Sequence, residues 1–191
     1  MQGWQFPYLG QRELPRHFSQ FELQAFFSFS AAEREVIARR RGDNHKLGLA
    51  LHIGFVRMTG RPLNSVRVVP SVLLVHLGRE LDIETPDLAS VRTLYARGRT
   101  LFDHQQQACE FLGFGWMTEH QRRALVRVLR DEVTQCADRE RLHAHARQWL
   151  YNHKLLVLRE RDIRALVASA LSELETGTAV AIRESVPPSS L

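Results

Sequence analysis

The stretch RRRGDNHKLGLALHIGFVRMTGR, residues 39–61, decides the fold of this chain. Apolar residues or glycine recur with the spacing of one face of an α-helix, at positions 47, 50, 51, 54, 55 and 58. Leu49, Ile53 and Val56 extend this apolar face around the helix. We therefore expect a helix that lies at the centre of the fold and is largely buried.

The same stretch carries the excess positive charge of the chain. It contains six of the 26 lysines and arginines but only one of the 21 acids, so its formal charge equals the +5 of the whole chain. The remaining 168 residues are balanced, with 20 basic and 20 acidic side chains. The basic ends of the expected helix lie roughly 20 Å apart at 1.5 Å per residue, about half a turn of duplex DNA. Such a local cluster favours a nucleic-acid partner.

Basic residues on both sides of this helix form the first candidate DNA-binding site. The free N–H groups and the dipole at its N-terminus suit a phosphate group. The alternative is a solvated turn, in which the arginines pair with nearby acids such as Glu33 and Glu35. The candidate contacts are Arg39, Arg40, Arg41, Asn44, His45, Lys46, Arg57 and Arg61.

A second candidate site surrounds the glycine at position 98. A short helix, a turn and a polar-fronted helix resemble a helix-turn-helix, in which amide side chains can read adenine edges. The alternative is an ordinary pair of packed helices. The candidate contacts are Arg97, Arg99, Thr100, His104 and Gln105. A third candidate is a stripe of arginines on one later helix, at positions 123, 127 and 130, which more often is only a solvated face.

Start and stop signals for further helices recur along the chain. Gly42 can end one helix in the left-handed conformation, and Asp43 or Asn44 can cap the next. Capping boxes start at Ser30 and Thr118. Further helices are expected over residues 18–27, 70–83, 85–96, 100–112, 118–136, 139–153 and 160–174. No convincing strand alternation appears, so we expect an all-α fold, a multi-helical orthogonal bundle with helix-turn-helix-like elements.

The expected helices fall into two groups. Residues 1–17 read as an extended arm because Pro7, Gly10 and Pro15 interrupt them. The first helical subdomain is expected over residues 18–113 and the second over residues 114–175, with the boundary between residues 113 and 117. Residues 176–191 read as a flexible, truncated tail.

Several motifs resemble those of the Tn-three family of replicative transposases. In that family an Arg-rich run, Gly-Asp, a basic residue and Leu-Gly precede an apolar helix and a Gly-Arg turn. The same elements occur here within residues 39–61. The segment GRTLFDHQQQACEFLGF, residues 98–114, resembles the family's Thr-Arg-x-x-His helix ending in Leu-Gly-Phe, with Leu101 where an Arg is usual. Arg147-Gln-Trp-Leu150 and residues 155–171 also fit, so the similarity covers nearly the whole chain.

The resemblance implies the N-terminal DNA-binding region of such a transposase, which recognises the terminal inverted repeats of a transposon. The family's catalytic domain is a strand-rich nuclease fold with three metal-binding carboxylates, and this chain is expected to end before it. Neither a His-Glu-x-x-His pair nor a Gly-rich phosphate loop occurs here. We therefore expect no catalytic activity of its own, no catalytic or metal-binding residues and no cofactor.

The expected partners are double-stranded DNA at the transposon ends and a second copy of the chain or a full-length transposase. No stretch approaches 18 uninterrupted apolar residues, so no membrane partner is expected. The expected location is the bacterial cytoplasm, at the nucleoid. The alternative function is that of a helical protein–protein interaction domain that assembles the transposition complex and touches DNA little.

Overall fold

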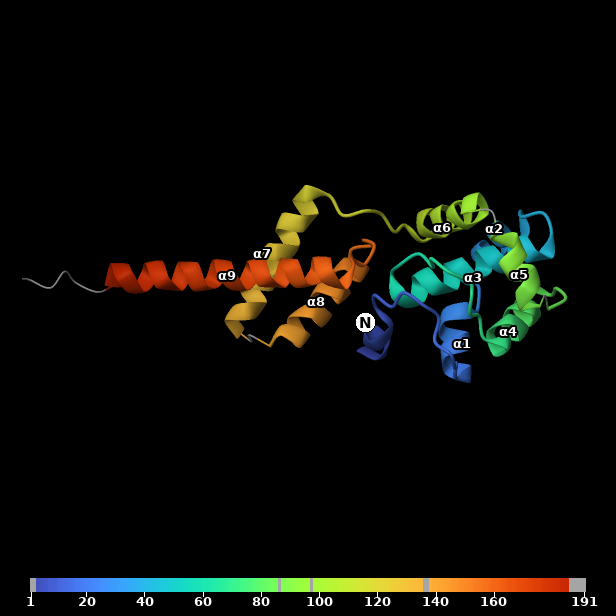
Figure 1. Ribbon diagram of the computed structural model, residues 1–191, viewed down its shortest axis with the longest axis horizontal. Helices are drawn as coiled ribbons and strands as arrows, with labels where there is room; N and C mark the ends of the chain where they lie inside the picture. The colour runs from blue at the N-terminus through green and yellow to red at the C-terminus, as the bar shows by residue number, and fades with distance from the viewer. Residues whose placement is uncertain (1–2, 86, 97, 136–137, 186–191) are drawn as a thin grey trace, which may run out of the picture. The chain divides into compact units, whose positions relative to one another are not determined.

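The computed structural model of the chain describes residues 3–85, 87–96, 98–135 and 138–185; for residues 3–5, 135 and 173–185 only the backbone is described. These residues form helices and connecting loops without a β-strand, so the predicted all-α bundle is confirmed (Figure 1). The chain divides into two compact units, residues 1–115 and 116–191, and this division falls within the predicted boundary segment 113–117.

The described residues of the first unit form a 3-10 helix and six α-helices. They are η1 (Gly3–Tyr8), α1 (Gln20–Phe27), α2 (Ala31–Ala38), α3 (Asp43–Thr59), α4 (Ser71–Leu81), α5 (Leu88–Leu94) and α6 (Gly98–Leu112). The second unit contains α7 (Glu119–Gln135), α8 (Arg139–Asn152) and α9 (Glu160–Ser185).

Helix α3 is the core of the first unit, as its apolar pattern predicted. Every residue from Leu47 to Val56 is buried, because α1, α2, α4, α5 and α6 all pack against it (Figure 1). Two glycines permit this close packing. A Cβ atom on Gly54 would lie 2.2 Å from the Phe27 ring, and one on Gly48 would lie 2.4 Å from the Tyr95 hydroxyl.

The capping residues follow the predicted pattern at the starts of α2 and α7 and at the end of α6. Ser30 and Glu33 form a reciprocal capping box at the start of α2, and Thr118 and Gln121 do the same at α7. Gly113 ends α6 with a φ of 74°.

The predicted caps around Gly42 were wrong. This glycine has φ 84° and ψ 141°, which is not the left-handed helical conformation, and it serves as the N-cap of α3. No side chain caps α3, and Asp43 is already its first residue rather than its cap. Glycine fits here because a positive φ is needed where the chain turns sharply from α2 into α3.

Both ends of the chain contain more helix than expected. Residues 3–8 form η1, and Leu9 and Leu14 are buried against the first unit, while the Gly10 N–H donates to the Thr59 carbonyl at 2.8 Å. Burial of these apolar residues outweighs the helix-breaking prolines on which the expected extended arm depended. At the other end α9 continues to Ser185, since good helix formers such as Ala179 and Ala181 precede the first proline. Residues 186–191 of the expected tail lie outside the described residues.

The second unit has its own apolar core between α7, α8 and α9. Its most buried side chains come from all three helices and from the loop before α9, and include Leu125, Leu129, Leu142, Leu150 and Ile163. This unit can therefore carry its surface arginines on a packed scaffold.

Candidate nucleic-acid interface

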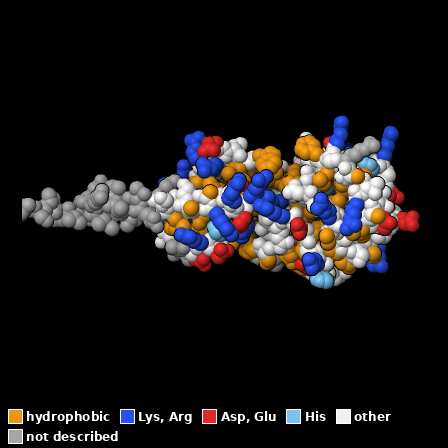
Figure 2. Space-filling view, viewed as in Figure 1, with side chains coloured by type: hydrophobic (Ala, Val, Ile, Leu, Met, Phe, Trp, Pro, Cys, Tyr) orange, Lys and Arg blue, Asp and Glu red, His pale blue; other side chains and the backbone are white. Residues whose placement is uncertain are grey.

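The loop between α2 and α3 and the first four residues of α3, together called the basic junction (residues 39–46), contain the most accessible positive charges of the central stretch. Arg39 and Arg41 are exposed, and so is Asn44. Arg39 forms a 2.6 Å ion pair with Glu35, and Lys46 forms a 2.9 Å ion pair with Asp43. Both pairs lie at the surface, where such contacts contribute about 0–1 kcal/mol, so a phosphate can compete for these side chains. Figure 2 shows that lysines and arginines of the first unit are dispersed among apolar and uncharged side chains in this view.

Arg40 differs from its two neighbours in the arginine triplet. Its side chain is half-buried and donates a hydrogen bond to the Gln107 side chain of α6, while its buried Nε atom has no protein partner. Arg40 therefore ties the basic junction to α6, and only part of its guanidinium faces outward.

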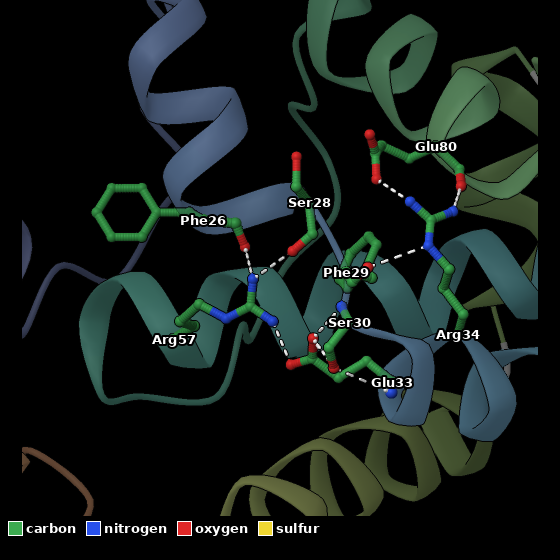
Figure 3. Close-up of polar contacts among 8 residues, drawn as sticks. All are labelled: Phe26, Ser28, Phe29, Ser30, Glu33, Arg34, Arg57 and Glu80. Atoms are coloured by element: carbon green, nitrogen blue, oxygen red, sulfur yellow. Dashed lines mark hydrogen bonds and ion pairs between the residues drawn. The ribbon is translucent and has the colours of Figure 1, made fainter.

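Arg57 and Arg61, at the far end of α3, are turned into the protein, contrary to the expected phosphate contacts. Arg57 Nη1 donates to the carbonyls of Phe26 and Ser28 at 2.8 Å each, and its Nη2 pairs with the Glu33 carboxylate (Figure 3). Arg61 is only 9% exposed. A guanidinium can satisfy three acceptors at once because its five N–H groups form a rigid fork. Arg57 therefore holds α1, α2 and α3 together.

The Glu33 carboxylate is the acid at the centre of this network. It accepts hydrogen bonds from the backbone N–H and the hydroxyl of Ser30 at 2.8 and 2.9 Å, besides the contact with Arg57. Burial raises the pKa of Glu33, but the Ser30 hydrogen bonds and the Arg57 charge outweigh it, so the pKa is lowered. Figure 3 shows a neighbouring bridge in which Arg34 of α2 reaches the Phe29 carbonyl and Glu80 of α4.

His104, expected to read bases, lies in the interior and is 1% exposed. A 2.8 Å hydrogen bond joins its Nδ1 to the Tyr95 hydroxyl, and its ring lies 5.6 Å from that of His45 and 6.1 Å from that of His52. His52 is fully buried, and neither of its ring nitrogens has a protein partner. A base contact by His104 would require α6 to leave α3, so this placement argues against the predicted role.

Burial keeps both of these histidines uncharged at neutral pH. It lowers the pKa of His52 to about 3, with a further contribution from His104. It lowers the pKa of His104 to about 4, and the charges of Arg40 and His45 lower it further, while Asp103 acts in the opposite direction. Burial also raises the pKa of Tyr95. The cluster therefore joins α3, α5 and α6 through neutral polar contacts.

Gln105 also faces inward. Its Nε2 donates to the Leu63 carbonyl at 2.7 Å and to the Asn64 side-chain oxygen at 3.2 Å. This amide is already occupied by the loop that follows α3, so it is not free to read a base. Thr100 is half-buried at the start of α6, and Arg97 lies outside the described residues.

The outward face of α6 combines Arg99, which was among the expected contacts, with two side chains that the sequence pattern did not select, Phe102 and Gln106. Arg99 has a 92% exposed side chain 4.0 Å from Asp103, and Phe102 is 61% exposed. Gln106 is exposed and donates to Glu110 at 2.7 Å. A helical wheel could have found this face, because positions 101, 104, 105, 108 and 112, all buried or half-buried, share the opposite side of the helix.

The arginine stripe of α7 lies on the solvent side of the second unit. Arg123 and Arg127 are exposed, and no acid of the described residues pairs with them, whereas Arg130 has an interaction within the protein. Leu125 and Leu129 face the core on the opposite side of the same helix.

Metal-ligating side chains do not cluster in the described residues. No group of three or more His, Cys, Asp or Glu side chains in this part of the chain is arranged to hold a metal ion. No helix in the described ranges is long and apolar enough to cross a membrane.

Comparison with known proteins relates these features to transposases. The chain is 60% identical over all 191 residues to the transposase for insertion sequence element IS1071 in transposon Tn5271 of Comamonas testosteroni, and spans 20% of that protein. Over 85 residues, 44% of this chain, it is 24% identical to the transposase for transposon Tn1546 of Enterococcus faecium, covering 8% of it. The chain thus spans a fifth or less of the length of these relatives. A family model described as a domain of unknown function, DUF4158, matches residues 11–170, and the chain therefore belongs to the DUF4158 family.

Proposed function

We propose that this chain is a DNA-binding module of a transposase, which recognises the terminal inverted repeats of a transposon and has no catalytic activity of its own. Its relatives are named as transposases, and the chain corresponds to only a small part of them. The excess positive charge of the sequence lies in one stretch that starts at the basic junction.

The observation that carries this proposal is the packing of α6 on α3. It brings the start of α3 beside a helix that lies about 60 residues further along the chain. Arg40 donates to Gln107, and the His45 ring lies 5.6 Å from that of His104. The basic junction and α6 therefore belong to one surface region of the first unit. The basic junction lies beside α6, and α6 follows the short helix α5 and a turn. This arrangement is suitable for docking on a DNA duplex.

Within this region the two elements have different roles. Arg39, Arg41 and Lys46 contact phosphates, because they are accessible and their ion pairs, where they have one, are exposed. The free N–H groups at the start of α3 add a further phosphate contact. Phosphate contacts supply affinity but carry no sequence information.

Base recognition comes from the exposed N-terminal half of α6. The Arg99 guanidinium can donate to the O6 and N7 atoms of guanine, and Phe102 can contact a thymine methyl group. His104 instead packs α6 against α3, and Gln105 holds the loop that follows α3. Direct readout thus keeps Arg99 from the expected contacts and assigns to Phe102 the role expected of His104 and Gln105.

Fluorescence anisotropy with labelled duplexes tests the proposal. One duplex carries the terminal inverted repeat of the element that encodes this chain, and a second has the same composition in scrambled order. We expect tighter binding to the repeat, and a dissociation constant Kd that rises steeply with salt for both. Equal affinity for the two duplexes at several salt concentrations, or no binding at low salt, would refute the proposed recognition.

The protein–protein interaction module is the second candidate function. Large apolar side chains are exposed on α1 and α4, namely Phe21, Val72 and Val75. Light scattering of the protein alone separates the two functions. A stable oligomer without DNA binding would favour the interaction module, whereas a monomer that prefers the repeat would favour DNA recognition.

A further inference from the structure

The loop between α3 and α4 (residues 61–69, here the α3–α4 loop) is firmly packed although it contains no helix or strand. Leu63, Val66 and Val69 are buried at every third position, which fixes the path of the backbone over the first unit. The residues between them point outward. Among them, Arg67 and Val68 are exposed at the outer edge of the loop.

Two helices hold this loop by side-chain hydrogen bonds to its backbone. Gln105 of α6 donates to the Leu63 carbonyl at 2.7 Å, and Arg92 of α5 donates through Nε to the Arg67 carbonyl at 3.1 Å. The loop is thus tied to both helices of the proposed recognition pair. Any duplex that docks on α6 meets a loop whose position is already set.

The outer side of the loop borders a hollow of about 480 Å³. Arg67 and Asn64 from the loop line it, together with Arg16 and Glu13 from the segment after η1. Both arginines are exposed, and no acid of the described residues forms an ion pair with either of them. With one acid against two arginines, the hollow has a net charge of +1, and two side chains in it can bind an anion.

We propose that this hollow is a second phosphate-binding site, in which Arg16 and Arg67 hold the backbone of the same duplex that α6 reads. The inference rests on the proposed DNA-binding function and adds a contact outside the basic junction and α6. Gln105 is a positioning residue in this scheme. It does not touch DNA but holds the α3–α4 loop, and with it Arg67, beside α6.

The first test is the salt dependence of DNA binding by the double variant Arg16→Ala/Arg67→Ala. Each lost phosphate contact lowers the magnitude of the slope of log K against log salt by about 0.9, so the double variant should lose about 1.8. The matched control is Arg12→Ala/Arg79→Ala, which removes two other exposed arginines of the same unit that do not line the hollow. Circular dichroism of both variants checks that they fold.

The outcomes separate this inference from the proposed function. If the wild-type chain fails to bind duplex DNA, both fall. If the wild-type chain binds and the two double variants change the slope equally, or not at all, only the phosphate site in the hollow is overturned. A loss of about 1.8 in the hollow variant alone supports it.

Hydroxyl-radical footprinting tests the positioning role of Gln105. We expect Gln105→Ala to lose the same protected backbone positions as the Arg16/Arg67 double variant, and to keep the positions protected by the basic junction. Its affinity for repeat and scrambled duplexes should fall by a similar factor. The positioning role is overturned if Gln105→Ala loses affinity only for the repeat duplex and still protects the backbone positions that depend on Arg16 and Arg67. Gln105 would then be a base-reading residue.

Discussion

Acid should destabilise the first unit, because His52 and His104 must remain neutral where α3 and α6 pack. Burial lowers the pKa of His52 to about 3 and that of His104 to about 4, against an ordinary value of 6.5. Below pH 6.5 the unfolded chain therefore binds more protons than the folded chain, and the free energy of unfolding falls until the pH reaches these lowered pKa values. Between pH 7 and pH 5 each histidine removes about 2 kcal/mol, and the pair about 4 kcal/mol.

The variant His52→Leu isolates half of this effect. It removes one titrating ring and also two buried nitrogens that have no protein partner. The pH-dependent loss between pH 7 and pH 5 should therefore fall from about 4 to about 2 kcal/mol. The control His17→Ala, at an exposed position of the same unit, should keep the wild-type dependence.

The protein is unfolded with urea at each pH, and pulsed hydrogen exchange detects the unfolding through peptides from α3. This measures the stability of the first unit separately from that of the second unit. The reasoning fails if the wild-type protein loses less than about 1 kcal/mol between pH 7 and pH 5. It fails equally if His52→Leu retains the full wild-type dependence, since the ring would then not be a buried neutral group.

Three further predictions concern the core and the basic junction. Arg57→Ala should lower the free energy of unfolding by about 3 kcal/mol, because it leaves a largely buried carboxylate without its partner; urea unfolding measures this. Gly54→Ala should cost about 1–3 kcal/mol through its clash with a phenylalanine ring, whereas Gly98→Ala meets nothing within 4 Å and should keep the wild-type Tm in thermal melts. Arg41→Ala should lower the magnitude of the salt slope of DNA binding by about 0.9, while Arg40→Ala should mainly lower Tm, because that side chain joins α6. Equal salt slopes for the two arginine variants would contradict this division.

The predicted fold depended mostly on local signals, and these were sufficient for most helices. The apolar run from Leu47 to Val56 identified the central helix, and capping boxes at Ser30 and Thr118 identified two starts. Where tertiary contacts decide, the local signals misled. The segment before α1 contains prolines typical of an extended arm, yet Leu9 and Leu14 pack it against the unit.

The candidate site was harder to predict because arginine and histidine side chains occur both at protein surfaces and in the interior, where they bind other polar groups. Arg57 occurs in a basic stretch, but only the three-dimensional structure shows the carbonyls and the Glu33 carboxylate that it satisfies. His104 belongs to a polar helix face by sequence, but Gly48 of α3 leaves room for it and for Tyr95. Polar partners that are distant in the sequence therefore determine which basic side chains remain exposed at the surface.

The formal charge of +5 in residues 39–61 is larger than the positive charge that this stretch could present to a DNA duplex. Three of its six basic side chains, those of Arg40, Arg57 and Arg61, are turned wholly or partly inward. At most three remain to neutralise phosphates from this stretch, which corresponds to a salt slope of roughly 2.7. A core helix with basic ends must use part of its charge to hold its neighbours, since a buried guanidinium needs acceptors. Under the proposed function, binding to DNA at physiological salt requires further cations, and exposed arginines beside α6 and on the α3–α4 loop are placed to supply them.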